Sequence, residues 1–155
     1  SLKVFLHTGS LYKGRGAELF SGLLERFSDI AIVHIGGDQS QLDYWTKEIG
    51  SERFYSKAHV SNDELVRYQV SAEYLLYPMT RATSTYWCCS PMKIFEYMAA
   101  RRPIVATSIG SIKEVLNDEN SFCFDPEKTE TLYNAVNDCI QDSSKLAKKT
   151  WHCFF

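Results

Sequence analysis

The stretch of sequence that decides the fold is residues 3–16, which read KVFLHTGSLYKGRG. Its first part, residues 3–7, is a largely apolar run with the length of a strand. Glycines at positions 9, 14 and 16 then predict a sharp turn. The apolar residues between 17 and 27 recur at helical spacing. We therefore expect the chain to open with a strand, a glycine-rich turn and a helix.

The same alternation of apolar runs and amphipathic segments continues along the chain. Further strands are expected at 30–35, 54–58, 73–77, 104–107 and 122–124, and further helices at 40–49, 62–71, 91–100, 112–116 and 127–140. Asn62 is expected to cap the helix that it begins, and Gly50 to end the helix before it. This pattern predicts a doubly wound α/β fold, a parallel sheet of about six strands with helices on both faces. Such sheets bind ligands at the carboxyl ends of their strands, beside helix N-termini.

Composition narrows the class of protein. The chain has 155 residues, a formal net charge of −2 and 45% hydrophobic residues, which is typical of a single globular domain. A near-neutral balance argues against nucleic acid as a partner. No apolar run approaches the roughly 18–20 residues that span a bilayer. The five cysteines show no metal-ligand spacing, so we expect free thiols, a cytoplasmic location and no metal.

The glycine-rich turn is the first candidate binding site. Its glycines allow backbone amides to approach an anion, and a following helix N-terminus adds partial positive charge. The spacing from Gly9 to Gly14 is that of a phosphate-binding P-loop, but Arg15-Gly16 replaces the required Lys-Ser/Thr pair. We therefore do not expect a nucleoside triphosphatase. The alternative interpretation is a plain turn that carries two solvated cations.

The second candidate is the predicted helix that begins near Ser90 and Pro91. Proline suits the first helical position, and the amides from Ser90 to Met92 would face an anion. Glu96, farther along, could accept two hydrogen bonds from a sugar diol. The alternative is an exposed glutamate paired with a neighbouring cation. The buried face of this helix is expected to comprise Ile94, Phe95, Met98 and Ala99.

Together these blocks resemble the C-terminal half of a GT-B glycosyltransferase. The resembling segments are 8–16, 90–99, 103–107 and 113–115, and the similarity is strongest to the retaining nucleotide-sugar enzymes of glycosyltransferase family 4. It spans residues 4–140, and the block 90–107 is its most specific part. The resemblance implies a Rossmann-like domain that binds a UDP-, GDP- or ADP-sugar, without a metal, for transfer to an acceptor with retention of configuration.

The resemblance also implies a role for particular residues. The pair Arg15-Gly16 matches the basic pair that holds the donor diphosphate, with Lys13 as a competitor, and Glu96 matches the glutamate that binds the donor ribose. Cys88 stands where the family carries a first glutamate. The other donor-binding residues expected from the two loops and the resemblance are Gly9, Ser10, Gly37, His59, Val60, Ser90, Pro91, Met92 and Lys93.

The resemblance further implies that an N-terminal acceptor-binding domain lies outside this chain. The chain alone is then expected to bind donor without turnover. A membrane-associated acceptor, in polysaccharide or lipopolysaccharide biosynthesis, would be bound through that other half. Three alternatives stay open: a non-catalytic nucleotide-sugar-binding or interaction domain, favoured by Cys88; an epimerase or phosphorylase of the same half-fold; and a flavodoxin-like domain for another phosphate ligand. His7 and His34 are expected to be core histidines.

Overall fold

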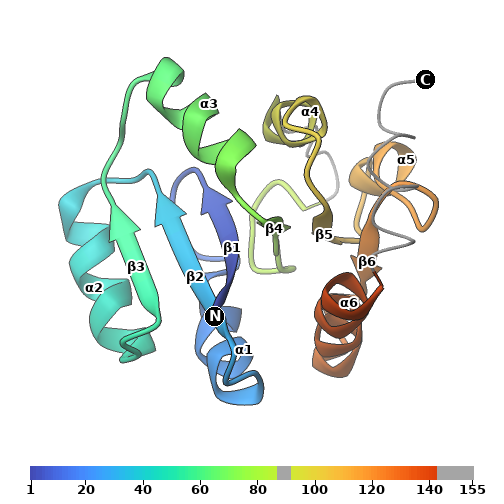
Figure 1. The fold of residues 1–155 in the computed structure, drawn as a ribbon, viewed down its shortest axis with the longest axis horizontal. Helices are drawn as coiled ribbons and strands as arrows, with labels where there is room; N and C mark the ends of the chain where they lie inside the picture. The colour runs from blue at the N-terminus through green and yellow to red at the C-terminus, as the bar shows by residue number, and fades with distance from the viewer. Residues whose placement is uncertain (87–91, 143–155) are drawn as a thin grey trace.

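The computed structural model describes residues 1–86 and 92–142 (Figure 1). Its strands are β1 (Lys3–Thr8), β2 (Ile30–Ile35), β3 (Phe54–Lys57), β4 (Tyr74–Tyr77), β5 (Ile104–Thr107) and β6 (Phe122–Phe124). Its helices are the 3₁₀ helix η1 (Ala17–Leu19), α1 (Phe20–Arg26), α2 (Gln39–Ile49), α3 (Asn62–Ser71), α4 (Met92–Ala99), α5 (Ile112–Val115) and α6 (Thr129–Gln141). Each expected element is present, with ends that differ by at most a few residues.

The strands form one six-stranded sheet in the order β3-β2-β1-β4-β5-β6. Every neighbouring pair is parallel. The direction in which successive strands are added reverses between β1 and β4. The connection that leaves β1 leads to β2 on one side, and the connection that leaves β4 leads to β5 on the other. In a doubly wound sheet this switch point opens a crevice at the carboxyl ends of the strands.

Helices lie on both faces of the sheet (Figure 1), and an apolar cluster fills the space on each face. One contains residues of α1, α2 and α6, including Phe20, Leu42 and Val136. The other contains residues of α4 and α5, including Ile94 and Ile112, with side chains of α3 packed against it. The expected doubly wound architecture is confirmed.

Two local predictions need correction. Ser61, rather than Asn62, caps α3: its hydroxyl accepts a hydrogen bond from the Glu64 amide at 3.3 Å. The predicted buried face of α4 is right for Ile94, which is buried, and wrong for Phe95, which is 51% exposed, and for Ala99, which is exposed. Met98 is half-buried against the core. Beside Ile94 the helix buries Tyr97, whose hydroxyl has hydrogen-bond partners inside the protein and whose ring fills the core.

No helix within residues 1–86 and 92–142 has both the length and the apolar character needed to cross a membrane.

Candidate functional site

The glycine-rich loop leaves β1 at the switch point. The Gly9 amide donates to the Ile35 carbonyl at 3.0 Å, so the loop starts beside the end of β2. Farther along, the Thr80 amide donates to the Gly14 carbonyl at 2.9 Å. Gly16 has a φ of +105°, and a Cβ placed on it would lie 2.3 Å from Pro78 Cγ. The loop therefore packs directly on the segment that follows β4.

The carboxylate of Glu18, in η1 directly after the loop, accepts hydrogen bonds from two amides of the loop. Glu18 accepts hydrogen bonds from Gly14 N–H at 2.5 Å and from Gly16 N–H at 3.1 Å. The sequence analysis expected the amides of this loop to approach an anion. Because these two amides already donate to Glu18, an incoming anion would meet the charged side chains of the loop instead.

Helix α2 holds the other end of the same loop. Gln41 Oε1 accepts from the Leu11 amide at 3.2 Å, and Trp45 Nε1 donates to the Leu11 carbonyl at 2.9 Å. Lys13 is exposed and lines a hollow together with α2 residues such as Gln41 and Tyr44. Lys13 thus lies on the α2 side of the loop.

Arg15, by contrast, is half-buried and acts on His7 of β1. Burial is the main reason why the pKa of His7 lies well below its usual value. The charges of Lys93 and Arg15 lower this pKa further, after the effect of His34, so both cations lie within electrostatic reach of the His7 imidazole. One cation of the first candidate block and one of the second therefore act on the same buried histidine of β1.

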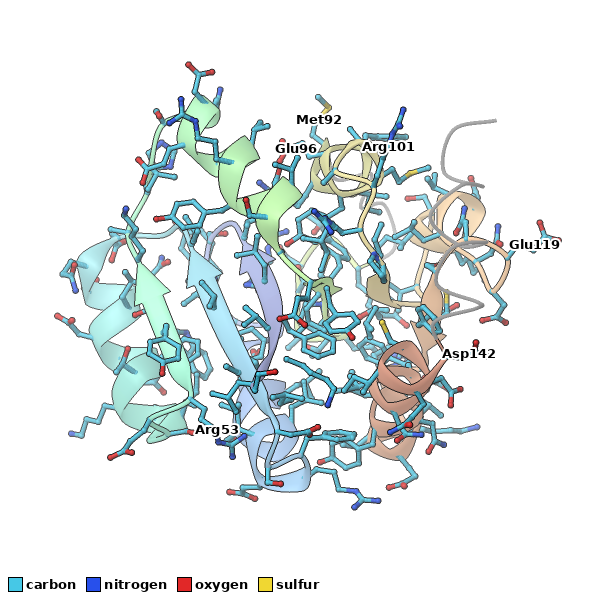
Figure 2. The ribbon with its side chains drawn as sticks, in the orientation of Figure 1. Arg53, Met92, Glu96, Arg101, Glu119 and Asp142 are labelled. Carbon is cyan, nitrogen blue, oxygen red and sulfur yellow. The ribbon has the colours of Figure 1, made fainter. Side chains whose placement is uncertain are left out.

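Helix α4 supplies Lys93 and Glu96. Lys93 Nζ lies 3.1 Å from Glu96 Oε2, and its side chain is 20% exposed. A Cβ placed on Gly9 would lie 4.0 Å from Lys93 Cε, which places this side chain over the start of the glycine loop. Figure 2 shows Glu96 on the side of α4 that faces α3, where it lines a cavity between the two helices.

Tyr97 fixes α4 to the switch point. Its buried hydroxyl accepts from the Thr8 amide at 2.9 Å and from the Thr8 hydroxyl at 3.2 Å, and it lies 3.4 Å from the Leu76 carbonyl. Burial raises the pKa of Tyr97, so the phenol stays neutral. One side chain thereby links α4 to the ends of both β1 and β4.

We expect Tyr97→Phe to lower the free energy of unfolding by about 2 kcal/mol, because the buried Thr8 amide loses its partner. Urea denaturation followed by circular dichroism measures this loss. Tyr133→Phe, which changes a half-buried tyrosine of α6, is the matched control. Equal unfolding free energies for Tyr97→Phe and the native chain would show that the Thr8 bonds contribute nothing.

The two strand histidines form a buried pair, as expected for core histidines. His7 Nδ1 and His34 Nδ1 are 2.8 Å apart, and His34 Nε2 lies 3.0 Å from the Gly36 carbonyl. A carbonyl can only accept, so neutral His34 carries its proton on Nε2, which leaves its Nδ1 as an acceptor facing His7 Nδ1. Burial lowers the pKa of His34 to about 4.

The remaining expected site residues are distributed as follows. The His59 amide donates to the Gly37 carbonyl at 3.3 Å, so these two segments meet after β2 and β3. Val60 is buried in the core beneath α3, Ser10 is half-buried, and Met92 is 76% exposed. Cys88, Ser90 and Pro91 lie outside the described residues, so their expected roles stay predictions.

Comparison with known proteins identifies the family. Residues 3–142 match the family model described as glycosyl transferases group 1. The chain belongs to this family. No curated protein sequence matches this glycosyltransferase domain.

Solved structures of glycosyltransferases share the fold. HepE from Anabaena, solved with UDP-glucose, has a TM-score of 0.81 at 19% identity, over 99% of this chain and 43% of HepE. Sucrose-phosphate synthase from Thermosynechococcus elongatus has a TM-score of 0.82 at 15% identity, over 99% of this chain and 40% of the synthase. This chain thus spans about two fifths of these proteins.

The third neighbour is itself a single domain. It is the C-terminal domain of the group 1 glycosyl transferase LpcC from Francisella tularensis, with a TM-score of 0.73 at 16% identity over 99% of this chain and 82% of that one. The expected resemblance to the C-terminal half of a GT-B enzyme is confirmed at the level of fold and family.

Sequence analysis missed the groups that support the site. Glu18 could have been found as an acid two residues after a loop glycine, at the start of a helix. Gln69 and Tyr97 gave no local signal, because their partners are far away in the sequence.

Proposed function

We propose that this glycosyltransferase domain binds the nucleotide diphosphate of a sugar donor at the carboxyl ends of β1 and β4. The observation that carries the proposal is that Lys93, paired to Glu96, lies over the start of the glycine loop. Arg15 of the same loop acts with it on the His7 imidazole at the end of β1. Two cations beside a strand end suit a diphosphate, and a carboxylate next to them suits the hydroxyl pair of a ribose.

In the proposed reaction, Arg15 and Lys93 stabilise the negative charge that develops on the leaving diphosphate. Charged groups held in place before the reaction stabilise such a charge without reorganising. Arg15 can contact two phosphate oxygens through its planar guanidinium, whereas the Lys93 ammonium acts as a point charge. Glu96 accepts hydrogen bonds from the ribose. The proposal requires no metal ion.

The complete enzyme, in this proposal, transfers the sugar with retention of configuration, as a member of glycosyltransferase family 4. The acceptor and any catalytic base would lie on a second domain, across the crevice. HepE in complex with UDP-glucose supports UDP as the first donor nucleotide to test. A membrane-associated acceptor and a cytoplasmic location belong to the same proposal.

The test is titration calorimetry of the 155-residue chain with UDP, GDP and ADP. We expect Arg15→Ala to weaken binding of the preferred nucleotide by about tenfold to a hundredfold, the effect of losing charge-assisted hydrogen bonds. Arg26→Ala, at the exposed last turn of α1, is the matched control and should bind as the native chain does.

Lys13→Ala decides between the two cations of the loop. Because Lys13 lies on the α2 side, we expect it to change the affinity far less than Arg15→Ala. Absence of binding for all three nucleotides, or an unchanged affinity in Arg15→Ala, would contradict the proposed site.

A further inference from the structure

Gln69, in the last turn of α3, is a buried polar residue that the proposed function does not use. Gln69 is only 3% exposed. Its Nε2 donates to Glu96 Oε2 at 3.2 Å, across the interface between α3 and α4. Burial of an amide is unfavourable unless its hydrogen bonds are made, so this contact is a constraint on both helices.

The contact lies at the wall of a cavity. Gln69 and Glu96 line a space of about 350 Å³ between α3 and α4, together with Asn62, Leu65, Val66 and Ala99. The Glu96 side chain is 42% exposed there, so a ligand can reach the carboxylate.

Two donors from different helices meet at one carboxylate oxygen. Lys93 lies 3.1 Å from Glu96 Oε2, and Gln69 Nε2 lies 3.2 Å from the same atom. A glutamate on a helix surface has several rotamers of similar energy, and a single partner one turn away leaves much of this freedom. A second donor, fixed in the core of the neighbouring helix, restricts the carboxylate to one position.

The chemistry of the second donor also matters. An amide donates a hydrogen bond without adding positive charge. The carboxylate therefore keeps its charge for other donors, and ionised acceptors form stronger hydrogen bonds than neutral ones. A second cation in the same place would compete with an incoming hydroxyl.

We propose that Gln69 is a positioning residue for ribose recognition. It holds Oε2 of Glu96, so that the carboxylate is presented in a fixed orientation to the hydroxyl pair of a ribonucleotide. This inference rests on the proposed function, and it makes the preference for a ribonucleotide over a deoxyribonucleotide depend on a residue of α3.

The experiment compares UDP with 2′-deoxy-UDP, and GDP with 2′-deoxy-GDP, by calorimetry on the native chain and on Gln69→Leu. Leucine preserves most of the buried volume and removes the donor. We expect the affinity for the ribonucleotide to fall about fivefold, the effect of one hydrogen bond. The affinity for the deoxynucleotide should stay within about twofold, because it makes less use of Glu96.

Gln39→Leu is the matched control. Gln39, like Gln69, donates to a carboxylate. Its partner is Asp43 Oδ1, at 2.8 Å and one turn along the same helix, on the exposed surface of α2. This variant should leave both affinities unchanged. Gln69→Met, which keeps the length of the side chain, repeats the test if the leucine variant does not fold.

The outcomes separate this inference from the proposed function. The positioning role alone would be overturned if Gln69→Leu and Gln69→Met left the affinity for the ribonucleotide unchanged. It would also be overturned if a variant weakened binding of the ribonucleotide and of the deoxynucleotide equally. A native chain that binds no nucleotide would overturn both. Native binding without preference for the ribonucleotide would overturn ribose recognition by Glu96, and the role of Gln69 with it.

Discussion

Replacing Gly16 with alanine should destabilise the domain by about 3 kcal/mol or more, through backbone strain and overpacking together. Gly16 has a φ of +105°, a conformation that other residues rarely adopt. Its new Cβ would lie 2.4 Å from the Pro78 carbonyl oxygen. That oxygen belongs to the backbone and cannot rotate away, so the glycine loop and the segment after β4 would have to separate.

Urea denaturation measures this loss, and Gly22→Ala is the control. Gly22 lies within α1, and its added Cβ would meet one side chain, the hydroxyl end of Tyr133 at 2.9 Å, rather than backbone. Alanine is the better helix former, so this variant should be close to neutral or more stable. A Gly16→Ala protein as stable as Gly22→Ala would show that the loop does not depend on its contact with Pro78.

Acidification from pH 7 to pH 4.5 should reduce the free energy of unfolding by about 2.5 kcal/mol through His34 alone. Burial holds the pKa of His34 at about 4 in the folded protein, against about 6.5 in an unfolded chain. Between these values the unfolded chain binds a proton that the folded protein does not, so stability falls as the pH falls. His7, whose pKa is lowered for the same reason, adds to the loss.

Chemical denaturation at several pH values tests this expectation. Asp29 and Asp38 have pKa values lowered by their hydrogen bonds, so their effect falls mostly below pH 4. Glu64, whose pKa Lys57 lowers, contributes at the lower edge of the window, equally in the native chain and in the histidine variants. The double variant His7→Phe, His34→Leu should show a much flatter profile between pH 7 and 4.5. His59→Gln removes an exposed imidazole and controls for the number of histidines. A native profile as flat as that of the double variant would contradict the buried neutral pair.

The fold was predictable because its signals are local. The apolar run 30–35 is β2 residue for residue, and Gly50 ends α2 with a φ of 58°, as a C-terminal glycine should. Alternation of such runs with helices, together with the rule that parallel strands need crossovers, leaves few topologies to choose from. The alternation does not decide among the doubly wound strand orders, so the order β3-β2-β1-β4-β5-β6 came from the structure.

The support of the site was not predictable, because it depends on pairs far apart in the sequence. Gln69 and Glu96 are separated by 27 positions, and Thr8 and Tyr97 by 89. Nothing near Tyr97 indicates that its hydroxyl has a backbone partner on β1, and without that partner a tyrosine is a poor choice for the buried face of α4. The face of this helix was misjudged for that reason.

The bonds that Glu18, Gln41 and Trp45 make to the glycine loop have a consequence for kinetics. Because these bonds are internal to the domain, the loop loses its conformational entropy when the chain folds, not when a ligand arrives. An arriving anion then meets a preorganised surface, which favours affinity. The glycine loop then does not have to close before the complex forms, so it does not slow association below the rate set by diffusion and orientation.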